Sequence, residues 1–225
     1  ASDVYKRQIL KHNYDETDFK AALQIPFEHD NTVLIEKFIP GREFRIFIIN
    51  DEVVGILHRV PANVTGDGVL NIGQLIDRKN EDPLRGKGYR TPLEKIRKGR
   101  EEEMFLKQQG MDFNTVPKEG EVVYLRENSN ISTGGDSIDF TDDIDDSYKA
   151  IAVEAAKALN VKITGLDMMI QDIHAPATPD NYAIIEMNFN PAIHIHCYPF
   201  KGKNRHLNHK MIRACLLYTS DAADE

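Results

Sequence analysis

The sequence has few cysteines, no long apolar run and no excess of basic residues, and each shortage excludes a class of protein. Its two cysteines, Cys197 and Cys215, have neither the spacing of a metal-binding motif nor the number that a disulfide framework needs. No apolar run reaches the roughly 18 residues of a membrane-spanning helix. No charged and then apolar leader opens the chain, so a signal peptide is not expected.

The charge balance argues against two further kinds of partner. Acidic residues outnumber basic ones, 36 to 28, which gives a formal net charge of −8 at pH 7. Non-specific binding to nucleic acid or to an anionic membrane needs a basic surface, so neither partner is expected. The sequence also lacks aromatic residues interleaved with basic ones, which a stacking platform for nucleic acid would require. A cytoplasmic location fits these features best.

What the chain does contain is enough apolar sequence for a core. Its 225 residues are 41% hydrophobic, as expected of one domain or of a unit with two lobes. Alternation and helical periodicity predict an ordered series of elements. These are helices at 15–23, 71–80, 100–109, 145–159 and 206–216, strands at 32–39 and 122–126, and a hairpin of 43–49 with 53–60. Helix 145–159 is expected to bury Ile151, Ala152, Ala155 and Leu159.

Two apolar segments near the C-terminal end carry the most informative polar residues. They run over 162–171 and 181–191, and a polar loop with two prolines separates them. If they pair as a hairpin, Asp167 lies beside Glu186, and Asn188 shares a face with Glu186 because strand side chains alternate. Hard divalent cations such as Mg²⁺ take such oxygen ligands. The alternative is that both carboxylates simply face solvent.

Three other stretches have two readings each. The basic stretch 80–98 is either a solvated arm or a flap over a polyanionic ligand. The loop that follows Arg126, residues 127–135, is rich in Asn, Ser, Thr and Gly and could present backbone N–H groups to an anion, although any turn-rich loop has this composition. The histidines His194 and His196 lie on one face, where a structural role is commoner than metal ligation.

Several ordered motifs resemble the ATP-grasp superfamily. The first set is Glu36-Lys-Phe-Ile-x-Gly-x-Glu43, then Gly165-x-Asp167, then Glu186-Met-Asn188. A second set resembles the branch that contains cyanophycin synthetase and the synthetase part of bifunctional glutamate–cysteine ligase/glutathione synthetases. It comprises residues 59–68, Asn80-x-Asp-Pro-x-Arg-Gly86, Leu125-Arg126 and Asn130-x-Ser-Thr-Gly-Gly135. The segment 186–199 is similar to the glutathione enzymes in particular.

The resemblance implies a fold. It is an α+β ATP-grasp fold of two lobes with antiparallel sheets and flanking helices, truncated at its N-terminus. A partial lid lobe is expected over 9–60 and a C-terminal lobe with the metal site over 61–216, whereas 1–8 and 215–225 read as non-native ends.

The resemblance also implies roles for single residues. Glu36, Lys37, Phe38 and Ile39 would contact the adenine of ATP, and Glu43 would hold the ribose hydroxyls. Asp167, Glu186 and Asn188 would bind Mg²⁺, with Mn²⁺ as the alternative ion, and Arg59 and Arg126 would face the transferred phosphoryl group. The loop residues Asn128, Asn130, Ser132 and Thr133 would bind phosphate or the peptide substrate.

The implied reaction is amide formation through an acyl phosphate, with γ-glutamylcysteine as the acid and glycine as the amine. A cyanophycin synthetase-type ligase and a non-catalytic ATP-binding module are the alternatives. The lysine-bearing strand and glycine-rich loop of the superfamily have no counterpart in 1–8, and the preceding ligase and lid regions are also absent. We therefore expect this chain alone to bind ATP weakly and to turn over poorly. The resemblance allows a homodimer.

Overall fold

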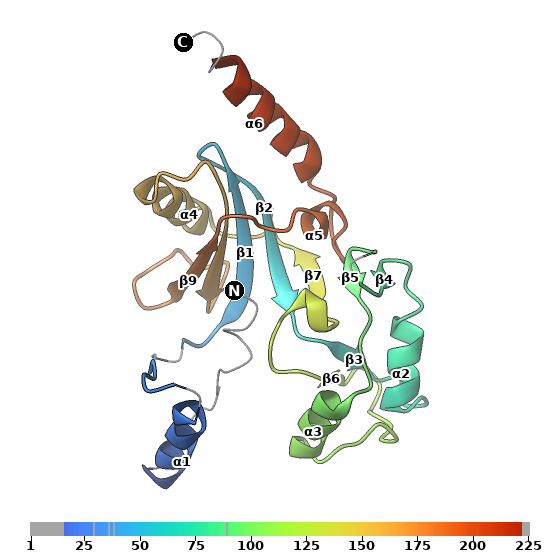
Figure 1. Ribbon diagram of the computed structural model, residues 1–225. Helices are drawn as coiled ribbons and strands as arrows, with labels where there is room; N and C mark the ends of the chain where they lie inside the picture. Colours follow the sequence, from blue (N-terminus) through green and yellow to red (C-terminus); the bar gives the residue numbers. More distant parts are fainter. Residues whose placement is uncertain (1–15, 29, 36, 38, 89, 222–225) are drawn as a thin grey trace. The chain divides into compact units, whose positions relative to one another are not determined.

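The computed structural model describes residues 16–28, 30–35, 37, 39–88 and 90–221 (Figure 1). Contacts divide the chain into two units, 1–40 and 41–225, which are described separately. In the first unit, α1 spans Glu16–Phe27. It covers residues 16–23 of the predicted helix, whose first residue lies outside the described part, and continues past Leu23 to include Pro26.

The strand predicted at 32–39 is wrong for the residues that the structure describes there. Residues 32–35, 37 and 39 have no strand conformation, and Leu34 and Ile35 are 80% and 64% exposed. A strand persists through hydrogen bonds to a neighbour, and among the described residues no strand pairs with this segment. Its β-branched composition is therefore not sufficient for a strand.

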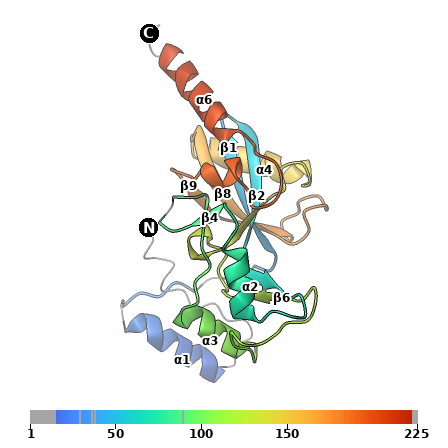
Figure 2. The same cartoon turned by 90° about the vertical axis from the view of Figure 1, so that its right-hand side faces the viewer.

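A five-stranded antiparallel sheet forms the centre of the second unit (Figures 1 and 2). The strand order is β7-β2-β1-β8-β9. The bounds are β1 Arg42–Ile49, β2 Glu52–Val60, β7 Asp136–Asp139, β8 Ile163–Ile170 and β9 Tyr182–Asn188. The two predicted hairpins, β1–β2 and β8–β9, are both confirmed. Asn50 and Asp51 have φ of 47° and 64°, as a tight two-residue hairpin turn requires.

Alternation along β1 gives the sheet two different faces. Phe44, Ile46 and Ile48 point to one face and form a core with Tyr148 and Ala152 of helix α4, which spans Asp146–Ala158. The predicted buried stripe of this helix is partly wrong. Leu159 is 60% exposed because the helix ends before it, and Tyr148, Ala152 and Ala156 form the buried row instead.

The opposite face of the sheet is apolar at one end and charged at the other. Phe47 and Ile49 pack with Cys197 and Leu207, which come from α5 (His194–Cys197) and α6 (Leu207–Asp221). Glu43 and Arg45 precede them on the same face by the two-residue period. The charged half of this face holds the candidate site.

A smaller subdomain lies between β2 and β7 in the sequence. It contains β3 (Asn63–Thr65), α2 (Ile72–Lys79), β4 (Arg85–Gly86), β5 (Leu93–Glu94), α3 (Arg100–Gln108), β6 (Val122–Tyr124) and the 3-10 turn η2 (Ile131–Thr133). β3 and β6 pair antiparallel, and Ile72, Leu75 and Ile76 of α2 pack in one core with Leu106 of α3. Asn71 and Gln74 cap α2 reciprocally, which places its start where the sequence predicts it.

The division expected at residue 60 does not separate two sheets. β1 and β2, which lie before it, are central strands of the sheet that also contains β8 and β9. The contacts divide the chain at Pro40 and Gly41 instead.

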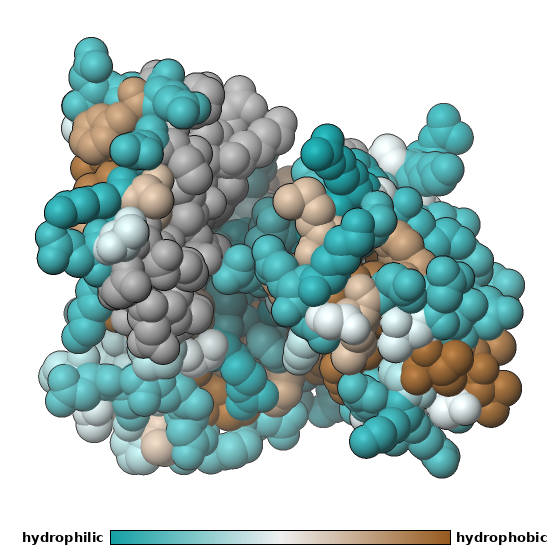
Figure 3. Space-filling model, turned by 90° about the horizontal axis from the view of Figure 1, so that it is seen from below, coloured by the Kyte–Doolittle hydropathy of each residue, from teal (hydrophilic) through white to brown (hydrophobic). Residues whose placement is uncertain are grey.

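Two surface properties complete the description. Within the described part of the chain, no helix is long and apolar enough to cross a membrane. Among the residues that Figure 3 colours, hydrophilic side chains predominate, with hydrophobic areas between them.

Candidate functional site

The predicted carboxylate pair meets across the β8–β9 hairpin. Asp167 is directly opposite Glu186, and Asn188 is opposite Gly165, so the three polar residues share one face of the sheet. The Asn188 Nδ2 atom donates a hydrogen bond to Glu186 Oε1 at 3.1 Å. The register shifts after Asp167, where Met168 pairs with Ile184, and this bulge leaves Ile185 as the additional residue of β9.

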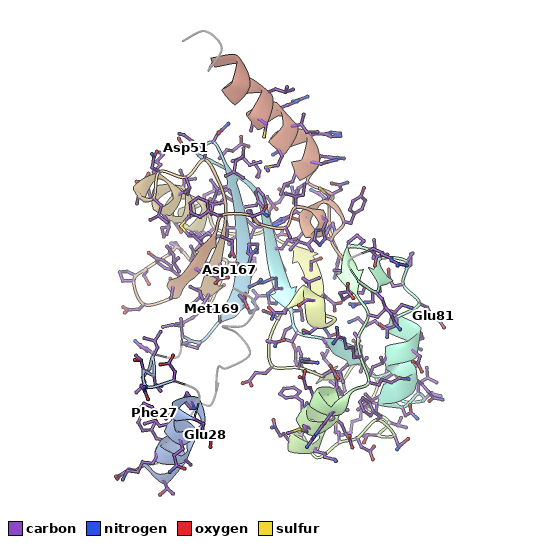
Figure 4. All side chains as sticks on the ribbon, viewed as in Figure 1. Phe27, Glu28, Asp51, Glu81, Asp167 and Met169 are labelled. Atoms are coloured by element: carbon purple, nitrogen blue, oxygen red, sulfur yellow. The ribbon has the colours of Figure 1, made fainter. Side chains whose placement is uncertain are left out.

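Two arginines hold the Asp167 carboxylate. Arg45 is the partner of Asp167 on β1, and its Nε and Nη2 atoms donate to the two carboxylate oxygens, the second at 2.7 Å. Arg59 of β2 donates from Nη2 to Oδ2 at 2.9 Å. Asp167 lies within the sheet and is 1% exposed (Figure 4).

The electrostatic balance at Asp167 favours the ionised form. Burial acts to raise the pKa of this carboxyl. The hydrogen bond from Arg45 and the charges of Arg59 and Arg45 more than offset the burial, so the pKa lies below its ordinary value. A buried carboxylate therefore stays charged because two guanidinium groups compensate it.

Glu43 joins the same cluster. It forms an ion pair with Arg59 and accepts a hydrogen bond from the Ser129 hydroxyl. Arg45 Nη2 also lies 4.0 Å from Glu186 Oε1. The cluster thus has three carboxylates and two guanidinium groups. Its formal charge is one net negative, which favours the binding of a cation.

A cavity of about 190 Å³ opens beside the two arginines. Its lining is Arg45, Arg59, Pro92, Glu94, Asn130, Ile131, Ser132, Ala192, His194 and Ile195. The structure therefore brings the predicted loop residues Asn130 and Ser132 to the same cavity as Arg59. The lining contains two guanidinium groups against the single carboxylate of Glu94, together with the polar residues Asn130 and Ser132, and this composition is suited to an anionic ligand.

The loop that carries these residues is held by local hydrogen bonds. Thr133 Oγ1 donates to Asn128 Oδ1 at 3.1 Å and to the Asn130 carbonyl at 2.9 Å. Gly134 has φ of 95°, and a Cβ there would lie 2.8 Å from the Ile96 Cα atom. A glycine is required at this position by both the backbone conformation and the close approach.

Arg126 lies in a different environment from the one that the sequence suggests. Its Nε atom donates to Glu102 Oε1 at 2.7 Å, and its guanidinium also forms an ion pair with Glu101. Both partners belong to α3, and Glu102 is 1% exposed. The structure thus pairs Arg59 with Asp167, whereas it pairs Arg126 with two carboxylates of α3.

The basic stretch 80–98 contains a buried side chain that neither of its two readings anticipates. The Arg85 side chain is fully buried and forms an ion pair with Asp136. Lys98 pairs with Asp77 at the surface, 2.7 Å away. A second, larger cavity of about 720 Å³ lies along this stretch, with both acidic and basic residues in its wall. We place the chemistry at the smaller cavity because only that one includes Arg45 and Arg59.

The remaining predicted residues are placed as follows. Glu36 and Phe38 lie outside the described residues, and Lys37 and Ile39 belong to the first unit.

His196 is buried, and burial, followed by the charge of Arg45, lowers its pKa to about 3. In the described part of the chain, no three His, Cys, Asp or Glu side chains form a cation site. A ligand set of two carboxylates and one amide falls outside that pattern.

Sequence reasoning missed Arg45 and the link between Glu43 and Asp167. The available signal was the two-residue period of β1, which puts Glu43 and Arg45 on the same face. Their proximity to Asp167 depends on which strand lies next to β1, and that is a property of the tertiary fold.

Comparison with known proteins was made by sequence and by structure. No family model matches the chain. The chain is 59% identical over 217 residues to the glutathione biosynthesis bifunctional protein GshAB of Desulfotalea psychrophila, covering 96% of this chain and 28% of that protein. It is 56% identical over 204 residues to the protein of the same name from Clostridium perfringens, covering 91% and 26%.

A solved structure agrees with these sequence matches. The crystal structure of a bifunctional glutathione synthetase from Pasteurella multocida matches with a TM-score of 0.75 and 45% identity, over 88% of this chain and 27% of that one. The chain therefore spans about a quarter of the length of the relatives that it matches. By sequence and by fold, it belongs with a segment of the bifunctional glutathione biosynthesis proteins, and its α+β architecture is the ATP-grasp fold.

Proposed function

We propose that this chain is the metal- and phosphate-binding part of a cytoplasmic, ATP-dependent carboxylate–amine ligase that joins γ-glutamylcysteine and glycine to make glutathione. The names of the relatives support glutathione as the product, and the two substrates follow from the resemblance. The observation that carries the proposal is the cluster on the charged face of the sheet, where Asp167, Glu186 and Asn188 meet Arg45 and Arg59 beside a cavity.

The donor set fits a hard divalent cation. Glu186 is 33% exposed at its side chain, and the Asn188 amide nitrogen donates to it, so the amide oxygen is the group that can coordinate a cation. Asp167 accepts three hydrogen bonds from the arginines, one on Oδ1 and two on Oδ2, and a carboxylate has about four lone pairs, so one on Oδ1 stays available. Mg²⁺, or Mn²⁺ in its place, would neutralise charge on the β and γ phosphates of ATP.

The reaction would have two steps. A carboxylate oxygen of γ-glutamylcysteine attacks the γ-phosphorus of ATP, the bond to the ADP oxygen breaks, and an acyl phosphate forms. The glycine nitrogen then attacks the acyl carbon, phosphate leaves with the electron pair of the broken C–O bond, and the nitrogen gives up its proton. Little covalent chemistry is required of the protein, so its contribution is position and charge.

The residues of this chain would supply that position and charge. Arg59 lines the cavity while Asp167 and Glu43 fix its guanidinium, so its remaining N–H groups can contact a phosphoryl or acyl phosphate oxygen. Asn130 and Ser132, which line the same cavity, would also bind the anionic ligand. The roles of Asn128 and Thr133 in substrate binding, of Arg126 at the phosphoryl group, and of 36–39 and Glu43 at the nucleoside of ATP stay predictions from the resemblance.

The test is ADP release by the full-length protein with Mg-ATP and candidate substrates. Release that requires both γ-glutamylcysteine and glycine, and that Asp167→Asn and Glu186→Gln abolish, is the expected result. Asp180→Asn, an exposed carboxylate in the loop between β8 and β9, is the matched control and should leave the rate unchanged. Release driven by an aspartate-containing peptide with arginine would favour a cyanophycin synthetase-type ligase. ATP binding without release would favour a non-catalytic module.

A further inference from the structure

The guanidinium of Arg45 contacts one carboxylate of the proposed metal site and approaches the other. It donates two hydrogen bonds to Asp167, and its Nη2 atom is 4.0 Å from Glu186 Oε1. Asp167 and Glu186 are direct neighbours across β8 and β9, and Arg45 is the direct neighbour of Asp167 on β1. The positive charge is therefore in the same row of the sheet as both carboxylates.

The position of this side chain is built into the backbone beside it. Gly165, two residues before Asp167, has no side chain, and a Cβ there would lie 3.0 Å from the Cδ atom of Arg45. The Arg45 side chain thus passes over the space that Gly165 leaves, next to Pro191. It is 9% exposed, so it closes the sheet side of the cavity.

Arg45 is not the only cation that compensates the negative charge of the Asp167 carboxylate. Arg59 donates to Asp167 Oδ2 at 2.9 Å and has its own second partner, Glu43. One guanidinium therefore stays on Asp167 if the other moves away. Arg45 is the one of the two that also approaches Glu186.

We propose that Arg45 is a positioning residue that competes with the divalent cation for Asp167 and Glu186 and is displaced when the cation binds. The proposal rests on the proposed function, because it concerns the same metal site. In the metal-free protein, the guanidinium keeps two like charges together that would otherwise repel. A divalent cation of higher charge then replaces it, and the freed guanidinium can turn to the anionic ligand in the cavity.

This role predicts an effect on metal affinity that a structural role would not produce. Arg45→Met removes the competing charge and keeps a side chain of similar length, so the affinity for Mn²⁺ alone should rise about tenfold or more. A residue that merely held the carboxylates in place would have the opposite effect, because its loss would loosen the site and weaken Mn²⁺ binding. The direction of the change therefore separates the two roles.

The experiment is isothermal calorimetry of Mn²⁺ binding without nucleotide, with unfolding measured in parallel. Arg45→Lys keeps the charge and should bind Mn²⁺ close to the wild type. Arg42→Met is the matched control, since Arg42 is on the same strand but stacks over Phe44 and Phe140 on the opposite face. It should leave Mn²⁺ affinity unchanged. If Arg45→Met does not fold, Arg45→Gln keeps a donor to Asp167 and has the same expected result.

The outcomes distinguish this proposal from the proposed function. Equal or weaker Mn²⁺ binding by Arg45→Met overturns the role of Arg45 and leaves the metal site in place. If the wild-type protein shows no Mn²⁺ binding that Glu186→Gln weakens, the metal site is absent. Both the proposed function and the role of Arg45 are then wrong.

Discussion

The ring of His196 packs edge-on against the ring of Phe47, with the centroids 5.4 Å apart and the planes at 80°. His196 is fully buried, and neither ring nitrogen has a hydrogen-bond partner among the described residues. Gly55 makes the space for the ring, since a Cβ there would lie 2.9 Å from His196 Nδ1. The titratable side chain of His196, which belongs to α5, is therefore buried at a position where an apolar side chain is commoner.

The first prediction is that the protein loses stability in mild acid through this residue. Burial, with a smaller contribution from Arg45, lowers the pKa of His196 from 6.5 to about 3, although the charge of Asp139 opposes the change. Burial lowers the pKa of His58 to about 4. The unfolded state binds more protons below pH 6.5, so the free energy of unfolding falls as the pH decreases from 6.5 toward these values.

Urea unfolding of His196→Leu at pH 7.5 and pH 5 measures this contribution. The leucine variant should lose roughly 2 kcal/mol less than the wild type between the two pH values. His174→Asn replaces an exposed histidine and should keep the wild-type pH dependence. A leucine variant as acid-sensitive as the wild type would contradict the prediction.

A second prediction concerns the buried network around Asp136. Lys79 Nζ lies 2.6 Å from Asp136 Oδ2, Arg85 pairs with Oδ1, and Asn63 donates at 3.0 Å. Both cations also lie over the ring of Phe200. Asp136→Asn leaves the buried Arg85 and the partly buried Lys79 without their counter-charge, so it should destabilise the protein by roughly 3–5 kcal/mol.

The control for Asp136 is a carboxylate of the same subdomain at the surface. Asp77 pairs with Lys98, and its side chain is 62% exposed. Asp77→Asn should cost about 1 kcal/mol or less, because water screens this pair. Similar losses for the two variants in urea unfolding would show that burial does not strengthen the Asp136 network.

A third prediction tests the close approach at Gly165. A Cβ at this position would lie 2.7 Å from the Pro191 Cβ atom, so Gly165→Ala must displace the segment after β9 or the Arg45 side chain. We expect a loss of roughly 1–3 kcal/mol in thermal or urea unfolding, as for other overpacked sites. Gly73→Ala, in helix α2 with its nearest contact at 3.3 Å, should be neutral or slightly stabilising. Equal behaviour of the two variants would refute the argument.

The extent to which sequence predicts this structure depends on the range of the interactions. The β8–β9 hairpin joins two apolar segments that follow each other in the sequence across the loop 171–181, so Asp167 and Glu186 could be placed together from the sequence. The segment 32–39 has an equally good strand composition but no pairing partner among the described residues. Local pattern therefore predicts a hairpin, whereas a single strand depends on a distant neighbour.

The same distinction explains the two arginines of the site. Arg126 is the last residue of a predicted strand and Arg59 the last but one, each before a polar loop, and the sequence offers no reason to separate them. The order of strands in the sheet places Arg59 on Asp167, while the packing of α3 against β6 gives Arg126 the buried partner Glu102. Arg45 was not predicted because its pairing with β8 joins residues 122 positions apart.

The last prediction decides between the structural and the phosphoryl-facing role of Arg126. Glu102 is 1% exposed, caps α3 by accepting from the Gly99 N–H, and forms an ion pair with Arg126. Arg126→Met should therefore destabilise the protein by roughly 3 kcal/mol, and adding Glu102→Gln should restore most of that loss because the buried charge is removed. Double-mutant analysis by urea unfolding measures the coupling. ADP release by folded Arg126→Met/Glu102→Gln within a fewfold of the wild type would assign Arg126 a structural role alone. A loss of about a hundredfold or more in that folded variant would instead place Arg126 at the transferred phosphoryl group, as the sequence suggests.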